Sequence, residues 1–327
     1  MINIVADVGL LCLLLTVALA IVCTRSPLSL VLLSGIYSIA LCTLFVILDA
    51  VDVAFTEAAV GAGISAILFF AVIRPEDEPV TAFSWPSSRA ILLGLGVGVL
   101  LLAGTLDMPM YGDHLAPAHQ HLALRFLGQS FEEIGIPNVV TSVLASYRGY
   151  DTLGEVVVIF TAGVAVLILQ PDNKKGPAKP GDRDRFAPEL MGNPVLKTVL
   201  LRMIPLVVLF GLYVQFHGDY GPGGGFQAGV ILGAGVITYG LLSSATRLKR
   251  IISDKWVTLG MALGVLVYGL VGVAGLFLGA NFLDYSVLGP TQTAGQHLGI
   301  LLIELGVGLT VSCTMVSLYY CFKQGES

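Results

Sequence analysis

Long apolar stretches recur along this chain, and their length constrains the fold more than any other feature of the sequence. A helix needs about 20 predominantly apolar residues to cross the hydrocarbon core of a bilayer. The chain is 55% hydrophobic and only 12% charged, with a mean hydropathy of +0.86, which excludes an ordinary soluble domain. We therefore expect an all-α membrane protein with nine spans, at about 5–24, 27–48, 51–73, 89–105, 150–169, 196–216, 226–245, 256–280 and 297–321.

The basic residues are distributed unevenly between the two sides that nine spans would create. If the N-terminus lies outside, the cytoplasmic segments are 25–27, 74–88, 170–195, 246–255 and 322–327. These segments, together with the adjoining helix ends, hold every Lys and Arg except Arg125 and Arg148. Cytoplasmic loops of membrane proteins are enriched in Lys and Arg. The pattern therefore predicts an N-terminus outside and a C-terminus in the cytoplasm.

Polar segments divide the predicted spans into three membrane domains. We expect a three-helix domain at 1–80, a two-helix domain at 81–170, a Pro-rich cytoplasmic linker at 171–195 and a four-helix domain at 196–327. The second domain contains a long external segment, 106–149, that is too polar to span. An amphipathic pattern at 122–134 predicts a short helix at the membrane surface within it.

The stretch from Tyr147 to Glu155, YRGYDTLGE, places two carboxylates at the mouth of a predicted span. Asp151 and Glu155 are four residues apart, so both fall on one helix face. One interpretation is a local ion pair between Arg148 and Asp151. Because one arginine cannot neutralise two carboxylates, we favour an acidic, hydrated entry where Na⁺ binds transiently at Asp151 and Glu155. Two carboxylates alone do not form a dedicated sodium cage.

Another acidic residue, Glu57, lies about two turns into the third predicted span, among small and apolar neighbours. Ionisable groups at membrane depth usually mark an ion or proton path. Small neighbours leave room for water, so we expect Glu57 to act as an intramembrane relay. Asp49 and Asp52 lie at the outer end of the same span, either as solvated interfacial groups or as part of this path.

The last predicted span carries Glu304 about 12 Å below its outer end, at 1.5 Å per residue. His297 precedes it by seven residues and falls on the same helix face. A buried glutamate with a histidine above it is typical of a proton relay. The alternative is a glutamate whose oxygens are satisfied by a neighbouring hydroxyl or carbonyl group.

The segment from His217 to Phe226, HGDYGPGGGF, predicts a tight or re-entrant turn because successive glycines adopt backbone angles closed to other residues. It lacks the Lys-Ser/Thr ending of a phosphate loop. After it, Gly225-x3-Gly229-x3-Gly233 indicates close helix packing, or else a subunit interface. The five cysteines lie in spans without C-x-x-C spacing, so we expect no metal or other cofactor.

These motifs carry a family resemblance. Arg202-Met-Ile-Pro, His217 and the segment Pro222-Gly223-Gly224-Gly225-Phe226 resemble the B subunit of Mrp-type (Mnh-type) multisubunit Na⁺/H⁺ antiporters. Residues 1–170 resemble the C-terminal part of the large A subunit, through Thr56-Glu57-Ala-Ala-Val-Gly-Ala, Pro137-Asn-Val-Val and the stretch from Tyr147 to Glu155. The sequence looks like a fusion of these two parts and departs from the usual large subunit in lacking its long N-terminal domain. The same pieces are similar to separate small subunits of Mrp-derived membrane-bound hydrogenases.

The resemblance implies a transporter subunit, not an enzyme, in the inner (plasma) membrane of a prokaryote. Its implied partners are small helical and large antiporter-like subunits of an Mrp-type complex and membrane lipid, with no nucleic acid. The relation to respiratory complex I places Glu57 in a helix similar to that complex's mobile small-subunit helix. One rival function is an ion-pumping subunit of an energy-converting hydrogenase or related redox complex. Another is a structural scaffold whose carboxylates are all paired.

Overall fold

The computed structural model describes residues 2–73, 87–110, 112–169 and 194–324, and every regular element in these ranges is a helix. Within them, nine helices are long and apolar enough to cross a membrane, which confirms the all-α prediction and the expected number of spans. They are α1 (Ile2–Cys23), α2 (Pro27–Ile47), the composite helix Val51–Val72, α5 (Ser88–Thr105), α8 (Gly149–Leu169), α10 (Pro194–His217), α11 (Gly225–Ser243), α13 (Asp254–Phe277) and α14 (Gln292–Gln324). Most of the predicted linker 171–195 and most of segment 74–88 lie outside the described residues.

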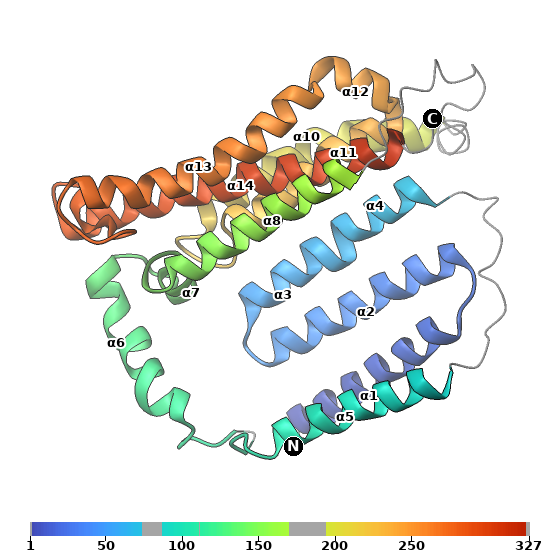
Figure 1. Cartoon of the computed structure of the whole chain (residues 1–327), viewed down its shortest axis with the longest axis horizontal. Helices are drawn as coiled ribbons and strands as arrows, with labels where there is room; N and C mark the ends of the chain where they lie inside the picture. Colours follow the sequence, from blue (N-terminus) through green and yellow to red (C-terminus); the bar gives the residue numbers. More distant parts are fainter. Residues whose placement is uncertain (1, 74–86, 111, 170–193, 325–327) are drawn as a thin grey trace.

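Consecutive spans run back and forth through one bundle, so that the two termini lie at its opposite ends (Figure 1). We call the end that holds the start of α1 the N-terminal end, and the other the C-terminal end. The third, fifth, seventh and ninth spans also begin at the N-terminal end (Figure 1). Residues near the starts of these spans therefore meet at one level of the bundle.

The third span is not the regular helix predicted for 51–73. It consists of α3 (Val51–Glu57), a π-helical stretch η1 (Ala58–Ile64) and α4 (Ser65–Val72). A π-helix forms wider i→i+5 turns and often occurs at functional sites. Apolar periodicity does not reveal the π-helical stretch. Every residue of Ala58–Ile64 is small or apolar, so an α-helix with this sequence would show the same pattern.

The main core lies in the second half of the chain, where α14 packs between α8, α11 and α13. Tyr268 of α13 and Tyr285 of the 3₁₀ turn η4 (Tyr285–Leu288) are fully buried. Their hydroxyls donate to the carbonyl oxygens of Gly149 (2.8 Å) and Ala145 (3.0 Å), respectively. Buried tyrosines need such partners, and these two attach the start of α8 to the core.

Helices α11 and α14 approach each other at backbone distance. A Cβ atom on Gly229 would lie 2.7 Å from the carbonyl oxygen of Gly308, and one on Gly225 would lie 2.1 Å from that of Glu304. Only glycine allows contacts this close. The structure thus confirms the packing role predicted for the Gly225-x3-Gly229 pattern.

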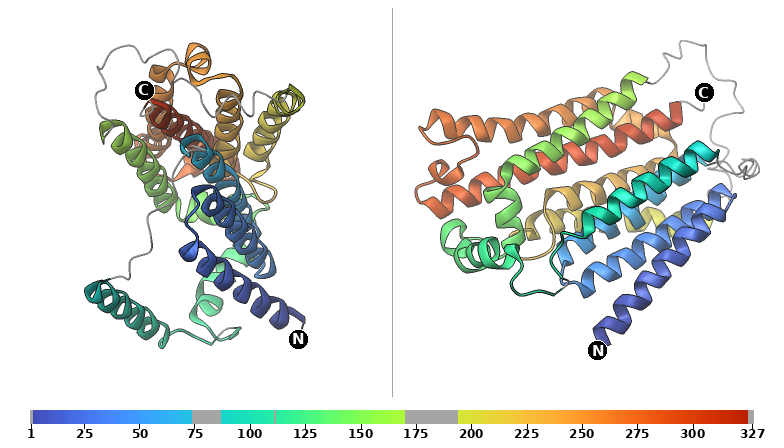
Figure 2. Two further views of the ribbon diagram at one scale, coloured as in Figure 1. Left: turned by 90° about the vertical axis from the view of Figure 1, so that its right-hand side faces the viewer. Right: turned by 60° about the horizontal axis from the view of Figure 1, so that its bottom comes forward.

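The first half of the chain is more loosely assembled. Helix α2 packs against α1 and against the third span, which in turn contacts α11 and α14. Helix α5 has no buried residue and stands apart from the main bundle (Figure 2). Serine caps begin two of these helices: Ser26 accepts from Ser29 N at α2, and Ser87 accepts from Ala90 N at α5.

The polar segment 106–149 forms short helices at the N-terminal end of the bundle (Figure 1). They are η2 (Ala118–Leu122), α6 (Ala123–Ile134), α7 (Val139–Thr141) and η3 (Ser142–Tyr147). As expected from its pattern, α6 is amphipathic, and it ends at Gly135, whose φ of +85° forms a left-handed cap. One further short helix, α12 (Ala245–Ile251), links α11 to α13 at the C-terminal end.

Candidate functional site

A cavity of about 270 Å³ lies between α3, α8, α11 and α14, near the N-terminal end of the bundle. Its wall carries three carboxylates, each from a different helix: Asp52, Glu155 and Glu304. Asp52 and Glu304 are partly buried, whereas Glu155 is exposed at the surface of the chain. The cavity has room for several water molecules. The three acids therefore line one shared space, and Glu155 lies at its exposed side.

Two neutral polar side chains link opposite walls of this cavity. Gln227 of α11 donates its Nε2–H to Oγ1 of Thr56 on α3, at 2.9 Å. Thr56 in turn donates to the carbonyl oxygen of Asp52, at 3.0 Å. Sequence reasoning did not identify this pair as part of the site. The sequence feature that could have indicated this hydrogen bond is Gln227, because an amide side chain within an apolar span requires a hydrogen-bond partner.

The glycine-rich turn between α10 and α11 forms one wall of the cavity, through Gly223, Gly224, Gly225 and Phe226. Asn138 holds this turn, because its side-chain amide donates to the carbonyl oxygens of Gly218 (3.0 Å) and Gly221 (2.9 Å). The Thr141 hydroxyl donates to the same Gly218 oxygen at 2.6 Å. Asn138 of the Pro137-Asn-Val-Val motif, together with Thr141, therefore holds the glycine-rich turn that contains Pro222.

Glu304 lies directly against this turn. A Cβ atom on Gly224 would lie 3.0 Å from Oε1 of Glu304, and one on Gly218 would lie 3.3 Å from it. Gly224 also has a φ of +111°, which disfavours any other residue. The turn thus brings backbone close to the carboxylate in a way that only glycine permits.

Glu57 does not line the cavity, although its neighbour Thr56 does. It ends α3 immediately before the π-helical stretch and is half-buried. A Cβ atom on Gly61 would lie 2.5 Å from Oε1 of Glu57 and 2.2 Å from Oγ of Ser38, so the carboxylate lies over Gly61 beside α2. Asp49 is exposed in the α2–α3 connection and has a φ of +56°.

The structure separates Asp151 from Glu155. The Nε atom of Arg148 lies 2.6 Å from Oδ2 of Asp151, so the local ion pair considered from the sequence is present. Both partners are exposed, and surface pairs of this kind contribute little stability. Glu155 forms no ion pair with another described residue and reaches the cavity. Of the two carboxylates, only Glu155 lines the cavity.

His297 contacts the turn and α6 and does not line the cavity. Its Nδ1 lies 3.4 Å from Oδ2 of Asp219, and its Nε2 lies 3.1 Å from the carbonyl oxygen of Gly135. Asp219 is also close enough to Glu304 to interact with it electrostatically. Sequence reasoning did not select Asp219, which contacts one member of the expected relay, His297, and interacts electrostatically with the other, Glu304. His217 stacks on Tyr213, with ring centroids 4.9 Å apart.

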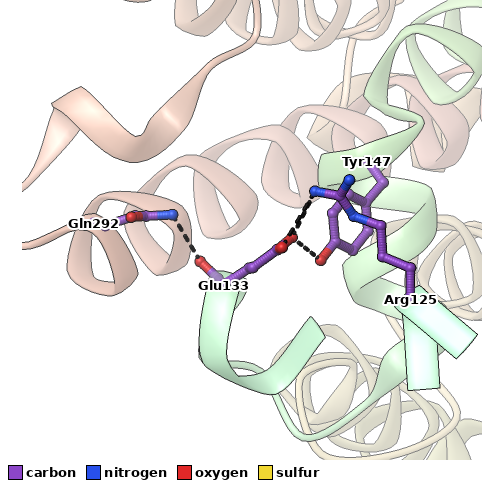
Figure 3. Close-up of polar contacts among 4 residues, drawn as sticks. All are labelled: Arg125, Glu133, Tyr147 and Gln292. Carbon is purple, nitrogen blue, oxygen red and sulfur yellow. Dashed lines mark hydrogen bonds and ion pairs between the residues drawn. The ribbon is translucent and has the colours of Figure 1, made fainter. Parts of the chain in front are cut away.

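A polar cluster beside the site attaches α6 to the rest of the molecule (Figure 3). The Tyr147 hydroxyl and the Arg125 guanidinium both donate to the Glu133 carboxylate. The Gln292 side chain donates to the Glu133 carbonyl oxygen, at 3.2 Å. The hydrogen bond from Tyr147, and then Arg125, holds the pKa of Glu133 below its usual value. Burial and the neighbouring Glu133 raise the pKa of Tyr147 to about 12.

Within the YRGYDTLGE stretch, Tyr147 therefore has a structural role, because its hydrogen bond to Glu133 anchors α6. Arg125 and Arg148, the two basic residues that the sidedness pattern left on the outer side, both form ion pairs with nearby acids. Across the described parts of the chain, no group of three or more His, Cys, Asp or Glu side chains is arranged to hold a metal ion. Among the described residues, the cavity is thus an acidic space with room for several water molecules and not a preformed metal cage.

Three known families match this chain over consecutive ranges. One described as "Domain related to MnhB subunit of Na+/H+ antiporter" matches residues 195–317. Two further families, described as the D and E subunits of MBH, match residues 12–75 and 88–171, respectively.

Similar proteins extend these matches. A protein of Rhizobium meliloti, described as a probable A/B subunit of a K(+)/H(+) antiporter, is 30% identical over 325 residues, which cover 89% of this chain and 31% of that protein. A putative antiporter subunit mnhB2 of Staphylococcus aureus is 30% identical over 136 residues, covering 41% of this chain and 96% of that protein. A chain of the Mrp complex from Dietzia sp. has a TM-score of 0.75 and 28% identity, covering 96% of this chain and 34% of that one. The present chain thus spans about a third of the length of the R. meliloti and Dietzia proteins.

Proposed function

The chain belongs to the Mrp/Mnh family of multisubunit antiporter subunits, and from this premise we propose that its acidic cavity forms part of the ion path of a monovalent cation/proton antiporter. In this proposal the chain is a multi-pass membrane subunit that exchanges Na⁺ for protons only together with its partners. Small helical subunits and large antiporter-like subunits of an Mrp-type complex would surround it.

The meeting of Asp52, Glu155 and Glu304 in one cavity is the observation that carries this proposal. Carboxylates bind protons and also coordinate hard cations. Three of them in one space at membrane depth are costly unless they are hydrated, paired or protonated. Such a group can bind a cation in one step and protons in another, which is the exchange that an antiporter requires.

We further propose that the N-terminus lies outside and the C-terminus in the cytoplasm. The distribution of Lys and Arg supports this orientation. The cavity lies near the N-terminal end of the bundle, so it would open toward the outer side. We also propose the domain division 1–80, 81–170 and 196–327, which is supported by the matched ranges 12–75, 88–171 and 195–317.

Other acidic groups extend the proposed path. Asp49 and Asp151, both exposed at the N-terminal end, would attract cations toward Glu155. Glu57, beside the π-helical stretch, would pass charge toward the middle of the membrane. His297 would act on Glu304 through Asp219, the carboxylate between them.

The direct test replaces each cavity acid by its amide in the complete complex. We expect Asp52→Asn, Glu155→Gln and Glu304→Gln each to reduce Na⁺/H⁺ exchange at least tenfold, because each removes a charge from the same space. Exchange is measured in inverted membrane vesicles with a pH-sensitive dye, and assembly is checked by copurification of all subunits. Glu132→Gln is the matched control, since Glu132 is an exposed acid of α6 outside the cavity.

The control variant should retain wild-type exchange. If all three cavity variants also exchange at the wild-type rate in an intact complex, the cavity is not on the ion path, and the chain is a scaffold.

A redox complex is the second candidate function, because two of the three matched families are named as MBH subunits. A gene for a nickel–iron hydrogenase subunit beside this one would favour that assignment. Genes for large antiporter-like subunits without a redox module would favour the antiporter.

A further inference from the structure

A short, positively charged surface lies at the C-terminal end of the bundle, far from the acidic cavity. It is formed by α12 and the first residues of α13, which connect the ends of two consecutive spans (Figure 1). A segment in this position lies at the level of a membrane surface, because the spans on both sides of it cross the bilayer.

One side of α12 is fixed to the core. Leu248 is buried, and Nζ of Lys249 lies 3.1 Å from Oδ2 of Asp254 and 4.8 Å from the centre of the Tyr320 ring. The Tyr320 hydroxyl donates to the carbonyl oxygen of Ile252, at 2.8 Å. Asp254, the one acid within α12 and the first residues of α13, is therefore already paired, and the position of α12 relative to α14 is set.

The other side of α12 presents cations to the outside. Arg247, Arg250 and Lys255 are exposed, and none of them forms an ion pair with another described residue. Arg247 and Arg250 are three residues apart, so they occupy one face of the short helix.

Large apolar side chains lie among these cations. Ile251 is 63% exposed and Trp256 is 68% exposed. Exposure of both side chains to water would be unfavourable, whereas tryptophan is enriched where a membrane meets water. Cations beside Ile251 and Trp256 are the arrangement of an interfacial element, with charges among the lipid headgroups and apolar groups below them.

We propose that the surface formed by Arg247, Arg250, Ile251, Lys255 and Trp256 binds the headgroups of anionic phospholipids. The phosphate groups would accept hydrogen bonds from Arg247, Arg250 and Lys255, while Ile251 and Trp256 contact the glycerol and upper acyl region. Basic segments next to spans prefer anionic lipid by about fivefold for each cation. The site is independent of the ion path and of the identity of the transported cation.

The test uses Trp256 as a reporter in the full chain. The chain contains two tryptophans, Trp85 and Trp256, so Trp85→Phe leaves a single fluorophore at the surface. The protein is placed in lipid nanodiscs that contain either brominated phosphatidylglycerol or brominated phosphatidylcholine at equal mole fraction, because bromine quenches tryptophan on contact. We expect stronger quenching by the anionic lipid, and a preference that falls as salt is raised.

Variants locate the effect. In the Trp85→Phe background, Arg247→Gln, Arg250→Gln and Lys255→Gln should each reduce the preference by up to about fivefold, and the triple variant should abolish it. The charge-conserving variant Arg247→Lys/Arg250→Lys should retain most of the preference, which separates loss of charge from a disturbed fold.

The matched control removes three other cations from the same end of the bundle: Arg89, Lys197 and Arg202. It should keep the preference intact. Equal quenching by the two lipids in the unmodified surface would overturn the proposal. A loss of the preference for anionic lipid in the control that is as large as in the triple variant would also overturn the proposal, because the net charge of the protein would then explain the preference. Shielding of Trp256 from both lipids in the assembled complex would assign this surface to a neighbouring subunit instead.

Discussion

Gly225→Ala perturbs a close approach of two backbones, between the start of α11 and the turn of α14 that carries Glu304. The added Cβ would lie 2.1 Å from the Glu304 carbonyl oxygen and 3.0 Å from Cβ of Val307. Carbon and oxygen atoms need more than about 3 Å, so the two backbones must separate by about 1 Å at this point. Overpacking of this kind costs about 1–3 kcal/mol. The same shift moves the Glu304 carboxylate away from Gly224, so exchange should also fall.

Gly269→Ala is the matched control, because a Cβ on Gly269 in α13 meets no atom within 4 Å. Alanine there should be neutral or stabilising by up to about 1 kcal/mol, since it favours the helix. We expect the Gly225→Ala complex to be less stable than the control by about 2–3 kcal/mol. Thermal unfolding can be followed with a thiol-reactive dye in a background in which the four cysteines that are not buried (Cys12, Cys23, Cys42 and Cys313) are replaced by serine. The dye then reports the exposure of Cys321, which is buried. If both variants unfold together and exchange ions normally, α11 and α14 do not touch as the structure shows.

Three further predictions concern individual side chains. Glu57→Gln keeps the shape of the side chain beside the π-helical stretch but removes its charge, so the complex should assemble and lose exchange; normal exchange would make Glu57 structural. Glu155→Gln should raise the Na⁺ concentration for half-maximal exchange more than Asp151→Asn does, because only Glu155 lines the cavity; equal shifts would contradict the separation of the two. Tyr147→Phe should loosen α6 by about 1 kcal/mol, since the hydrogen bond to Glu133 is partly solvated. That hydrogen bond lowers the pKa of Glu133. Its contribution to the stability of α6 is therefore complete above the usual carboxyl pKa, and it is lost as pH falls through the lowered pKa. The protection factors of the α6 amides, which correct for the slower intrinsic exchange in acid, should therefore fall with pH in the wild type and fall less in the Phe variant.

Local features of the sequence were sufficient for much of this description. The nine spans follow from runs of apolar residues, because each span must satisfy its own backbone hydrogen bonds whatever lies beside it. The ion pair of Arg148 with Asp151 could be anticipated for a similar reason, since the two residues are only three positions apart. The amphipathic helix α6 and the turn before α11 were also visible as local patterns.

Contacts between distant residues were not accessible in this way. The π-helical stretch at Ala58–Ile64 leaves no mark on an all-apolar pattern. The separation of Asp151 from Glu155 depends on which side of α8 faces α3 and α14, and i, i+4 spacing does not determine that. The contact of Asp219 with His297, and its electrostatic interaction with Glu304, depend on how the turn folds back onto α14.

The sequence by itself determined that this chain is a helical membrane protein, approximately where its spans lie, and which few acids lie within them. Those properties depend on the free energy of transferring each segment into lipid, which is a sum over neighbouring residues. Only the tertiary structure decided that Asp52, Glu155 and Glu304 share one cavity while Glu57 and Asp151 lie outside its wall. The physical reason is that lipid does not order helices relative to one another, so their positions depend on close packing, such as that of Gly225 and Gly229 on α14.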